Sequence, residues 1–264
     1  MFFALLACAG TVAIEEAELE IPASAEVLGE EPTLRTQSLE DGRVEITEGS
    51  VTLTLTPHLH ASTLLEFGEV SVWLDPWSKR AFGDVSPADY VLITDIHADH
   101  MDPAGLAAVS GPDTRVFGPQ AVADALAPTE IVVLANGETT ALLDPLTLSA
   151  VPMYNHTRGP EPGKLYHDKG RGNGYLLSQG GLVLYIAGDT ACTDEMKALE
   201  NVDVALIPMN LPYTMTPEEA AECVAAFKPT VAIPYHYRDS DPGVFAAALE
   251  GSGVQVLRVE YYPE

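Results

Sequence analysis

The segment Asp95-Ile96-His97-Ala98-Asp99-His100 brings four side chains that can bind a metal ion within six residues of sequence. It follows an apolar run, residues 90–94, whose β-branched and aromatic composition is typical of a buried strand. In α/β proteins the carboxyl end of a strand is the usual place for a functional site. Imidazole and carboxylate groups together suit zinc, manganese or iron. The sequence therefore predicts a metal centre at the end of this strand.

Further ligand-type residues follow other apolar runs. His236 directly ends one run, His60 closes another, and Asp189 comes after a third, where Gly188 permits a tight turn. A single histidine in such a place is usually a hydrogen-bonded core residue. Repeated delivery of these residue types to strand ends is how a preorganised metal centre is assembled. The histidine pattern therefore supports the same centre.

The elements that position these residues are predicted from the spacing of apolar side chains. Short β-rich runs occur at residues 51–56, 63–67, 70–74, 90–94, 131–134, 146–151, 175–177, 182–186, 202–207, 231–233 and 254–259. Helical patterns lie at residues 103–109, 119–126, 194–199 and 217–227. The last has a clear start, because Thr216 can cap it and Glu219 completes a capping box. Hairpin-like strands followed by strands alternating with helices predict an α/β protein of two mixed sheets with helices outside.

The spacing of the ligand-type residues resembles the metallo-β-lactamase superfamily, whose signature is a strand followed by His-x-His-x-Asp-His. The resemblance extends over roughly residues 50–240 and includes Leu74-Asp75-Pro76-Trp77, Ala187-Gly188-Asp189-Thr190 and Ile233-Pro234-Tyr235-His236. It implies a four-layer αββα sandwich of two mixed β-sheets. It also implies a metal-dependent hydrolase of small-molecule substrates.

Within the superfamily, the chain is most similar to the branch that contains L-ascorbate-6-phosphate lactonase and N-acylphosphatidylethanolamine phospholipase D. The features of that branch are His60-Ala61-Ser62, the segment Met209–Met215 and the helix start Thr216–Ala220. These motifs are specific to the superfamily and its fold, and they do not identify a substrate. A lactone, a phosphodiester and a related ester or amide bond all fit such a centre.

The resemblance implies two divalent metal ions, with zinc as the first choice and manganese or iron as alternatives. His97 matches a ligand of the first metal. Asp99, His100 and His236 match ligands of the second. Asp189 matches the carboxylate that bridges the two ions.

Two positions of the first metal site depart from the family pattern or are left open by it. Asp95 stands where the family usually has its first histidine. An aspartate can still coordinate, but its harder, negatively charged oxygen favours manganese or iron over zinc, or weakens the first metal altogether. For the third ligand of this metal we favour His167, because the glycine-rich stretch after it leads directly into a strand; His156 is the runner-up, and Asn155 lies near the same point.

The resemblance also implies a mechanism in which the metals activate a water molecule as a hydroxide nucleophile and stabilise the developing oxyanion. Asp99 is expected to orient that hydroxide. His60 is expected either to give a proton to the leaving group or merely to close its strand by a hydrogen bond. Asp75 is expected to orient a ligand histidine. Tyr213 and Arg171 are candidates for lining the substrate pocket.

Two other functions are kept open at this point. The first is a non-catalytic, metal-binding scaffold whose first metal site is degenerate through Asp95. The second is a di-iron oxidoreductase on the same fold, as in the flavodiiron branch. That branch carries an additional flavin-binding domain and a glutamate in its signature, and this sequence has neither.

Composition bounds the partners of the protein. The formal net charge is -26, and the 13 basic residues are scattered, so we predict no nucleic-acid partner. The sequence leaves the oligomeric state open. The three cysteines, Cys8, Cys192 and Cys223, form no CxxC pair, which argues against a thiolate zinc cluster or a redox dithiol. Cys192 is interpreted as a small buried hydrophobic residue.

The N-terminal segment resembles a targeting signal in its composition. Residues 1–14 contain Leu5-Leu6-Ala7-Cys8, which resembles a bacterial lipobox, and residues 15–42 are interpreted as an acidic tether. A hydrolase domain is then expected over residues 43–264. These features predict a lipoprotein of the bacterial cell envelope or periplasm, held to the membrane through a lipidated Cys8. The alternative is a cytoplasmic enzyme with an apolar N-terminus.

Overall fold

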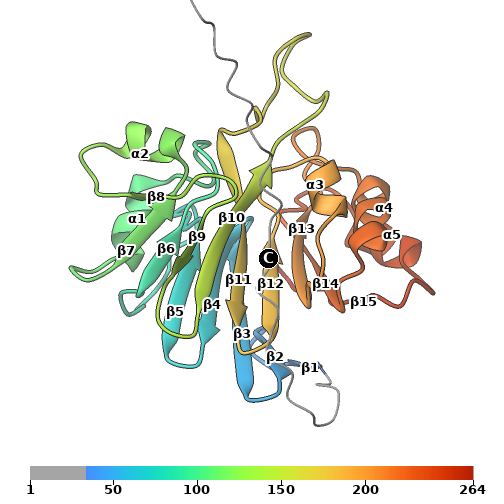
Figure 1. The fold of residues 1–264 in the computed structure, drawn as a ribbon, viewed down its shortest axis with the longest axis horizontal. Coiled ribbons are helices and arrows are strands. Elements are labelled where there is room, and N and C mark those ends of the chain that lie inside the picture. Colours follow the sequence, from blue (N-terminus) through green and yellow to red (C-terminus); the bar gives the residue numbers. More distant parts are fainter. Residues whose placement is uncertain (1–33, 264) are drawn as a thin grey trace, which may run out of the picture.

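The computed structural model describes residues 34–263, and these residues form two β-sheets packed face to face with helices outside them (Figure 1). The first sheet has eight strands in sequence order: β1 Arg35–Ser38, β2 Val44–Glu48, β3 Val51–Leu59, β4 Ser62–Phe67, β5 Val70–Leu74, β6 Tyr90–Leu92, β7 Arg115–Gly118 and β8 Val132–Val133. The second has seven: β9 Thr139–Ala141, β10 Thr147–Met153, β11 Gly172–Gln179, β12 Leu182–Ile186, β13 Val204–Pro208, β14 Val231–Tyr235 and β15 Gln255–Val256.

Both sheets change from antiparallel to parallel pairing part-way across. In the first sheet the strands from β1 to β5 pair antiparallel, and those from β5 to β8 pair parallel. In the second, β9 to β12 pair antiparallel and β12 to β15 parallel. Neighbouring parallel strands end at the same edge of a sheet. The residues that follow β5 and β6 are therefore close together, and so are those that follow β12, β13 and β14.

The core lies mainly between the two sheets. Fully buried apolar side chains from the first sheet, such as Leu53 and Leu65, belong to one cluster with Leu148, Leu177 and Leu184 of the second. Each buried leucine side chain contributes roughly 2 kcal/mol relative to an exposed one. Three strands of the second sheet, β12, β13 and β14, are buried on both faces, because every one of their residues is buried. This explains their continuous apolar sequences.

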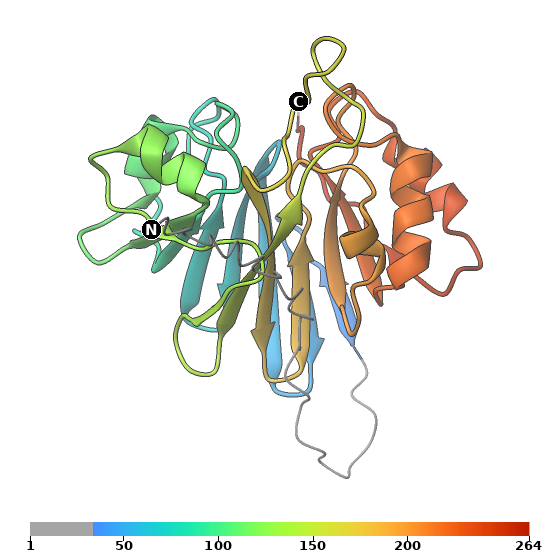
Figure 2. The same cartoon turned by 45° about the horizontal axis from the view of Figure 1, so that its top comes forward.

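The helices cover the outer faces of the sandwich. In Figures 1 and 2, α1 (Pro103–Val109) and α2 (Gln120–Leu126) lie beside the parallel strands of the first sheet. A second apolar cluster joins these two helices to Trp73 and Val91. In the same views, α3 (Asp194–Lys197), α4 (Pro217–Phe227) and α5 (Pro242–Ala248) lie beside β13 to β15. The long loop between β10 and β11 extends past the ends of the sheets (Figure 2).

The expected elements agree with the structure in type, and five elements were missed. All eleven strand-like runs overlap a strand, and the capping box of Thr216 and Glu219 is present at the start of α4. The missed elements are β1, β2, β7, β9 and α5. Three of these strands are short, and short runs carry little periodicity. β1 lies within residues 15–42, so the first sheet begins eight residues before the expected domain boundary at residue 43.

The lipobox-like segment around Cys8 lies outside the described residues. Within residues 34–263, no helix is long and apolar enough to cross a membrane.

Candidate metal centre

The ligand-type residues reach one site because each follows the end of a strand. β6 ends at Leu92, and the chain continues directly into the 95–100 segment. His236 is the first residue after β14, and its backbone N–H donates to the carbonyl of His60, which lies in the turn between β3 and β4. This bond joins the two sheets at the site. Both histidines have positive φ angles, 47° for His236 and 63° for His60, which is uncommon for residues with a side chain.

One half of the site is formed by Asp95, His97 and His167. Nδ1 of His97 lies 3.1 Å from Nε2 of His167 and 2.9 Å from Oδ2 of Asp95. Nε2 of His167 lies 3.8 Å from the same carboxylate oxygen. We call these three residues the first half-site. His167, the favoured third residue, belongs to it because the loop between β10 and β11 folds back over the end of β6.

The other half is formed by His100, His236 and Asp99. Nε2 of His100 and Nε2 of His236 lie 3.2 Å apart. Oδ2 of Asp99 lies 3.6 Å from Nε2 of His236 and 3.9 Å from Nε2 of His100. We call these three residues the second half-site.

Asp189 lies between the two half-sites. Its Oδ2 is 3.3 Å from Nε2 of His167 in the first half-site and 3.4 Å from Nε2 of His100 in the second. Its Oδ1 is 3.2 Å from Nε2 of His236. Gly188, at φ 65°, makes the turn that carries Asp189 inward. The carboxylate is thus placed to serve both halves at once.

The donor chemistry of these residues fits divalent metal ions. Nε2 of His100 and Nε2 of His236 both face the site, 3.2 Å apart, and Oδ1 of Asp189 accepts no hydrogen bond from the described residues. Burial alone would raise the pKa of Asp189, but His236 and His100 hold it well below its ordinary value. Burial also lowers the pKa of His236 to about 3, so its imidazole is neutral and can donate a lone pair. A cation would satisfy all of these groups together.

Two supporting residues fix the orientation of ligand histidines. Asp75, which follows β5, accepts a hydrogen bond of 2.7 Å from Nδ1 of His100 and is itself held by the backbone and hydroxyl of Thr94. Asn155 accepts hydrogen bonds from the backbone N–H and Nδ1 of His167, at 3.0 and 2.8 Å. In both histidines Nε2 is therefore left facing the site. Asn155 is a supporting residue here, and sequence position had suggested it only as a candidate ligand.

A third supporting contact involves Tyr262, which no sequence motif had indicated. Its hydroxyl bonds to Nδ1 of His60, while Nε2 of His60 lies 3.1 Å from Oδ2 of Asp99. An ionised carboxylate can only accept a hydrogen bond, so the proton between His60 and Asp99 is on Nε2 of His60. Burial raises the pKa of Tyr262, so its hydroxyl keeps a proton that it can donate to Nδ1 on the other side of the ring.

The comparisons with known proteins identify the family. The sequence pattern of the beta-lactamase superfamily domain matches residues 54–236. The chain belongs to the metallo-β-lactamase superfamily. The UPF0173 metal-dependent hydrolase of Aeropyrum pernix is 32% identical to it over 197 residues, which cover 67% of this chain and 79% of that protein. A candidate metal-dependent hydrolase from Parabacteroides distasonis has a structure with a TM-score of 0.76 and 35% sequence identity, covering 88% of this chain and 100% of the other.

These matches confirm the predicted superfamily and its fold. The lactonase-like and phospholipase-D-like branch stays a prediction. The diiron β-hydroxylase CmlA from Streptomyces venezuelae has a TM-score of 0.63 at 17% identity, covering 82% of this chain and 54% of that protein. At this identity the likeness shows the shared fold alone. The superfamily match ends at His236, so Tyr262 lies outside the matched residues.

Arg171 pairs with Asp95, a contact that the sequence did not predict. We predicted that it lines the substrate pocket. Instead, its Nε donates to Oδ1 of Asp95 at 3.0 Å and its Nη2 to Oδ2 at 2.9 Å. Nη2 also donates to the carbonyl of Tyr166. The physical reason is the burial of Asp95, because a fully buried carboxylate needs a charged or hydrogen-bonding partner.

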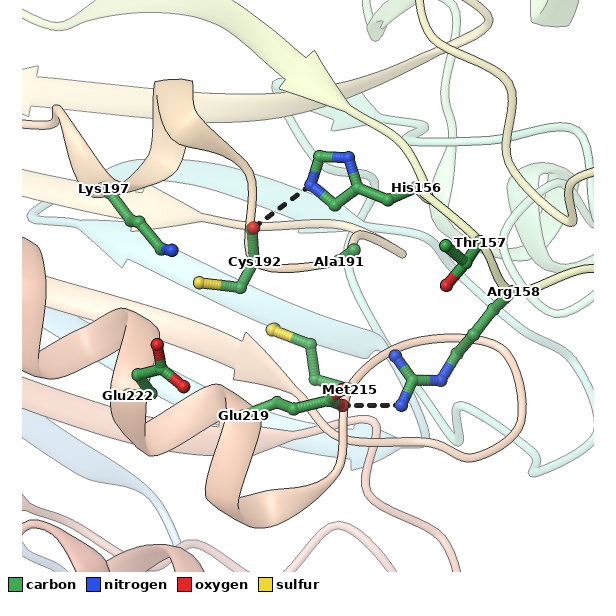
Figure 3. A pocket seen from close by; sticks show the side chains of 9 residues that line it. All are labelled: His156, Thr157, Arg158, Ala191, Cys192, Lys197, Met215, Glu219 and Glu222. Carbon is green, nitrogen blue, oxygen red and sulfur yellow. Dashed lines mark hydrogen bonds and ion pairs between the residues drawn. The ribbon is translucent and has the colours of Figure 1, made fainter.

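His156, the runner-up for the third ligand, lies away from the centre. It is exposed and its Nε2 bonds to the carbonyl of Cys192 (Figure 3). It lines a separate pocket of about 220 Å³ together with Arg158 and Lys197, where Arg158 pairs with Glu219. Its position one residue past Asn155 points it to the opposite side of the loop.

Two of the metal-binding side chains are partly exposed, and they show how the centre is reached. The side chains of His97 and Asp99 are 38% and 28% exposed, whereas His100, His167 and His236 are fully buried. The centre is therefore reached past His97 and Asp99.

Tyr213 packs its ring edge-on against Tyr166, and its carbonyl accepts a hydrogen bond from Asn155. Its role in lining the substrate pocket stays a prediction.

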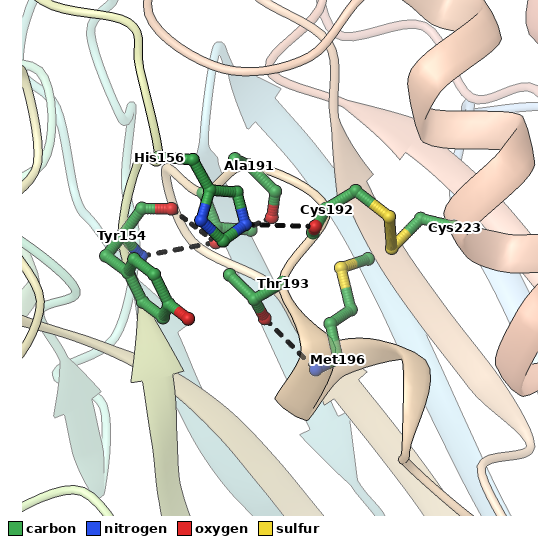
Figure 4. The surroundings of a disulfide bond; sticks show 8 residues. Tyr154, His156, Ala191, Cys192, Thr193, Met196 and Cys223 are labelled. Atoms are coloured by element: carbon green, nitrogen blue, oxygen red, sulfur yellow. Dashed lines mark hydrogen bonds between the residues drawn. A yellow bond between two sulfur atoms is a disulfide. The ribbon is translucent and has the colours of Figure 1, made fainter.

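Cys192 and Cys223 form a disulfide, which the sequence interpretation missed (Figure 4). Cys192 follows Asp189 by three residues, and Cys223 is buried in α4. The disulfide therefore ties the segment that carries the shared carboxylate to a covering helix. Spacing could not reveal it, because the two cysteines are 31 residues apart and meet only through the fold.

Proposed function

We propose that this protein is a hydrolase that uses divalent metal ions to cleave a lactone, a phosphodiester or a related ester or amide bond in a small molecule. The observation that carries the proposal is the position of Asp189 between two sets of histidines. A shared carboxylate of this kind suits two ions close together. The names of the relatives in Aeropyrum pernix and Parabacteroides distasonis, both described as metal-dependent hydrolases, support the same class of reaction.

The residues that would hold the ions are Asp95, His97 and His167 on one side, Asp99, His100 and His236 on the other, and Asp189 between them. Zinc, manganese and iron all accept this mixture of imidazole and carboxylate. When bound, such ions polarise the scissile group and lower the pKa of water at neutral pH.

The side chains of the protein supply orientation and proton transfer. Asp99 is partly exposed at the mouth of the site and accepts a hydrogen bond from His60, so its carboxylate can orient an attacking water. Tyr262 fixes the ring of His60 with the proton on Nε2. His60 thereby holds a transferable proton at the edge of the site, where a leaving group would need it.

The charge of the chain favours a neutral substrate among these classes. With a formal net charge of -26, the surface repels strongly anionic molecules at a distance. A lactone, an ester or an amide approaches without that repulsion. We therefore favour a neutral lactone, ester or amide as the substrate over a phosphodiester, which is negatively charged.

The disulfide adds support to the proposed location. Disulfides persist in oxidising compartments such as the bacterial periplasm and are rare in the cytosol. The Cys192–Cys223 pair is therefore in keeping with a protein of the cell envelope, tethered through Cys8. We propose this location ahead of the cytoplasm.

The experiment combines metal content with turnover on the full-length protein. Protein purified without added metal or chelator is analysed by elemental mass spectrometry. It is then tested with lactones, carboxylate esters, thioesters and phosphodiesters under zinc, manganese or iron. We expect bound metal and hydrolysis of at least one neutral class. His167→Gln should bind less metal and lose activity, whereas the matched control His156→Gln should keep the metal content and activity of the unmodified protein. Metal-replete protein without hydrolysis of any of these classes would favour the scaffold, and oxygen-dependent turnover with iron would favour the oxidoreductase.

A further inference from the structure

The two half-sites differ in charge, and Arg171 causes the difference. Both oxygens of Asp95 accept hydrogen bonds from the guanidinium of Arg171, at 3.0 and 2.9 Å. Oδ2 is also the oxygen that faces His97, so the atom offered to a metal ion is already shared with a fixed cation. An arginine does not lose its proton in a protein. The charge of Asp95 is therefore neutralised within the protein.

Among residues 34–263, no arginine or lysine pairs with the carboxylate of the second half-site. Asp99 faces His100 and His236 with hydrogen bonding only from the imidazole of His60. Behind His100, Asp75 adds another buried carboxylate through Nδ1 of the ring. Asp189 is common to both halves. The charge of Asp99 is thus offset by no arginine or lysine of the described residues, whereas the charge of Asp95 is offset by Arg171.

We propose that the Arg171–Asp95 pair makes the centre unequal, so that one divalent ion binds tightly in the second half-site and another binds more weakly in the first. In this arrangement Arg171 is a positioning residue that sets the affinity of the first half-site through Asp95. The fold places it there by a second contact, in which Nη2 donates to the carbonyl of Tyr166 at 2.6 Å. The guanidinium is thus held in place whether or not an ion is bound.

This inference rests on the proposed function, because that proposal names the side chains that bind the ions. The inference itself concerns only how tightly the ions bind. Supporting residues around a metal site commonly change its affinity by about 10–100-fold. We expect a difference of the same order between the two halves in the unmodified protein.

The test is a titration of metal-free, full-length protein with cobalt(II). Calorimetry measures the affinity of each step, and visible absorption reports the coordination of the bound ion. Cobalt(II) accepts the same imidazole and carboxylate ligands and reports its coordination by colour. The expected result is two steps, with the second at least about 10-fold weaker than the first. Two steps of equal affinity would overturn the inference.

Matched substitutions separate the charge of Arg171 from its shape. Arg171→Gln keeps a hydrogen-bond donor but removes the charge, so the weak step should tighten by about 10-fold or more. Arg171→Lys keeps the charge, and its weak step should stay within about threefold of the unmodified protein. An Arg171→Gln variant whose weak step is unchanged or weaker would contradict the proposal. If that variant fails to fold, the titration of the unmodified protein still decides, because two steps of equal affinity overturn the inference.

Two further variants assign each step to its half-site. His236→Gln should abolish the tight step, and His97→Gln should abolish the weak one; the reverse pattern would overturn the inference. Hydrolysis is no part of this readout. If the protein binds cobalt(II) in two unequal steps but hydrolyses nothing, the inference stands and the proposed function falls. If the protein is an active hydrolase but binds in two equal steps, the proposed function stands and the inference falls.

Discussion

The hydroxyl of Tyr262 bonds to Nδ1 of His60, although 202 residues separate them in sequence. The contact closes a chain of hydrogen bonds that runs from the C-terminal segment through His60 to Asp99 at the mouth of the site. Neutral imidazole has one ring proton, and a donor at Nδ1 forces that proton onto Nε2. The structure thus links the C-terminal segment to the protonation pattern of the centre.

Tyr262→Phe is expected to lower kcat by about 10-fold, because His60 is then free to place its proton on Nδ1. KM should change little, since the substitution removes no group that faces the substrate. The matched control is Tyr261→Phe, whose hydroxyl bonds to Thr63 and does not contact His60. Long-range nitrogen NMR of the His60 ring checks the cause, because it reports which nitrogen carries the proton. An unchanged proton position with reduced kcat would contradict this explanation.

Asn155 is expected to control the first half-site through His167. Asn155→Ala removes the acceptor of two hydrogen bonds from His167, so the weak cobalt(II) step should weaken further by about 10-fold while the tight step is retained. Asn155→Asp keeps an acceptor for Nδ1 and should stay closer to the unmodified protein. Titration of both variants, with thermal melting as a check on folding, measures the effect. Equal binding by the alanine variant and the unmodified protein would show that His167 needs no such support.

The residues of the centre could be predicted from sequence where they are local to a strand end. The 95–100 segment, Asp189 and His236 each follow an apolar run, and parallel pairing within each sheet brings the strand ends to the same edge of that sheet. His167 could be favoured over His156 because of the glycine-rich stretch that leads into β11. The layers of the sandwich were likewise predicted from the order of strands and helices.

The contacts that the sequence missed all join segments far apart in the chain. Arg171 meets Asp95 over 76 residues, and Cys192 meets Cys223 over 31. Such pairs depend on how a loop folds over the strand ends, which no local pattern encodes. Arg171 was only a candidate for lining the substrate pocket, and a solitary arginine in a glycine-rich loop gives no sign of a buried partner.

The disulfide is expected to stabilise the protein by about 3 kcal/mol, because it closes a loop of 31 residues in the unfolded chain. Cys223→Ala should lose that stability in urea unfolding. Reducing agent should lower the stability of the unmodified protein but leave the variant unchanged, and Cys8→Ser should behave like the unmodified protein. Metal content is measured on the same samples, because Cys192 lies three residues after Asp189. A stability that is insensitive to reducing agent in all three proteins would contradict the prediction.

Glu48, at the end of β2, is nearly buried next to Asp203, and its Oε2 has no hydrogen-bond partner among the described residues. Burial and the neighbouring carboxylate raise its pKa from 4.5 to about 7. The folded protein therefore keeps a proton that the unfolded chain releases above pH 4.5. Stability linked to this proton is fully present below pH 4.5 and is lost as the pH rises through 7.

Glu48→Gln is therefore expected to be more stable than the unmodified protein at pH 8, by about 1–2 kcal/mol once partial access of water is allowed for. At pH 4.5 or below the two proteins should differ little, because glutamine resembles the protonated carboxyl. Urea unfolding at both pH values measures the change. The control is Glu45→Gln, on the same strand but half-exposed, which should show no such dependence on pH. A difference between Glu48→Gln and the unmodified protein that is equal at both pH values would mean that the proton on Glu48 is not the cause. Because Glu48 is not among the residues of the centre, hydrolase activity of the folded variant should be unchanged.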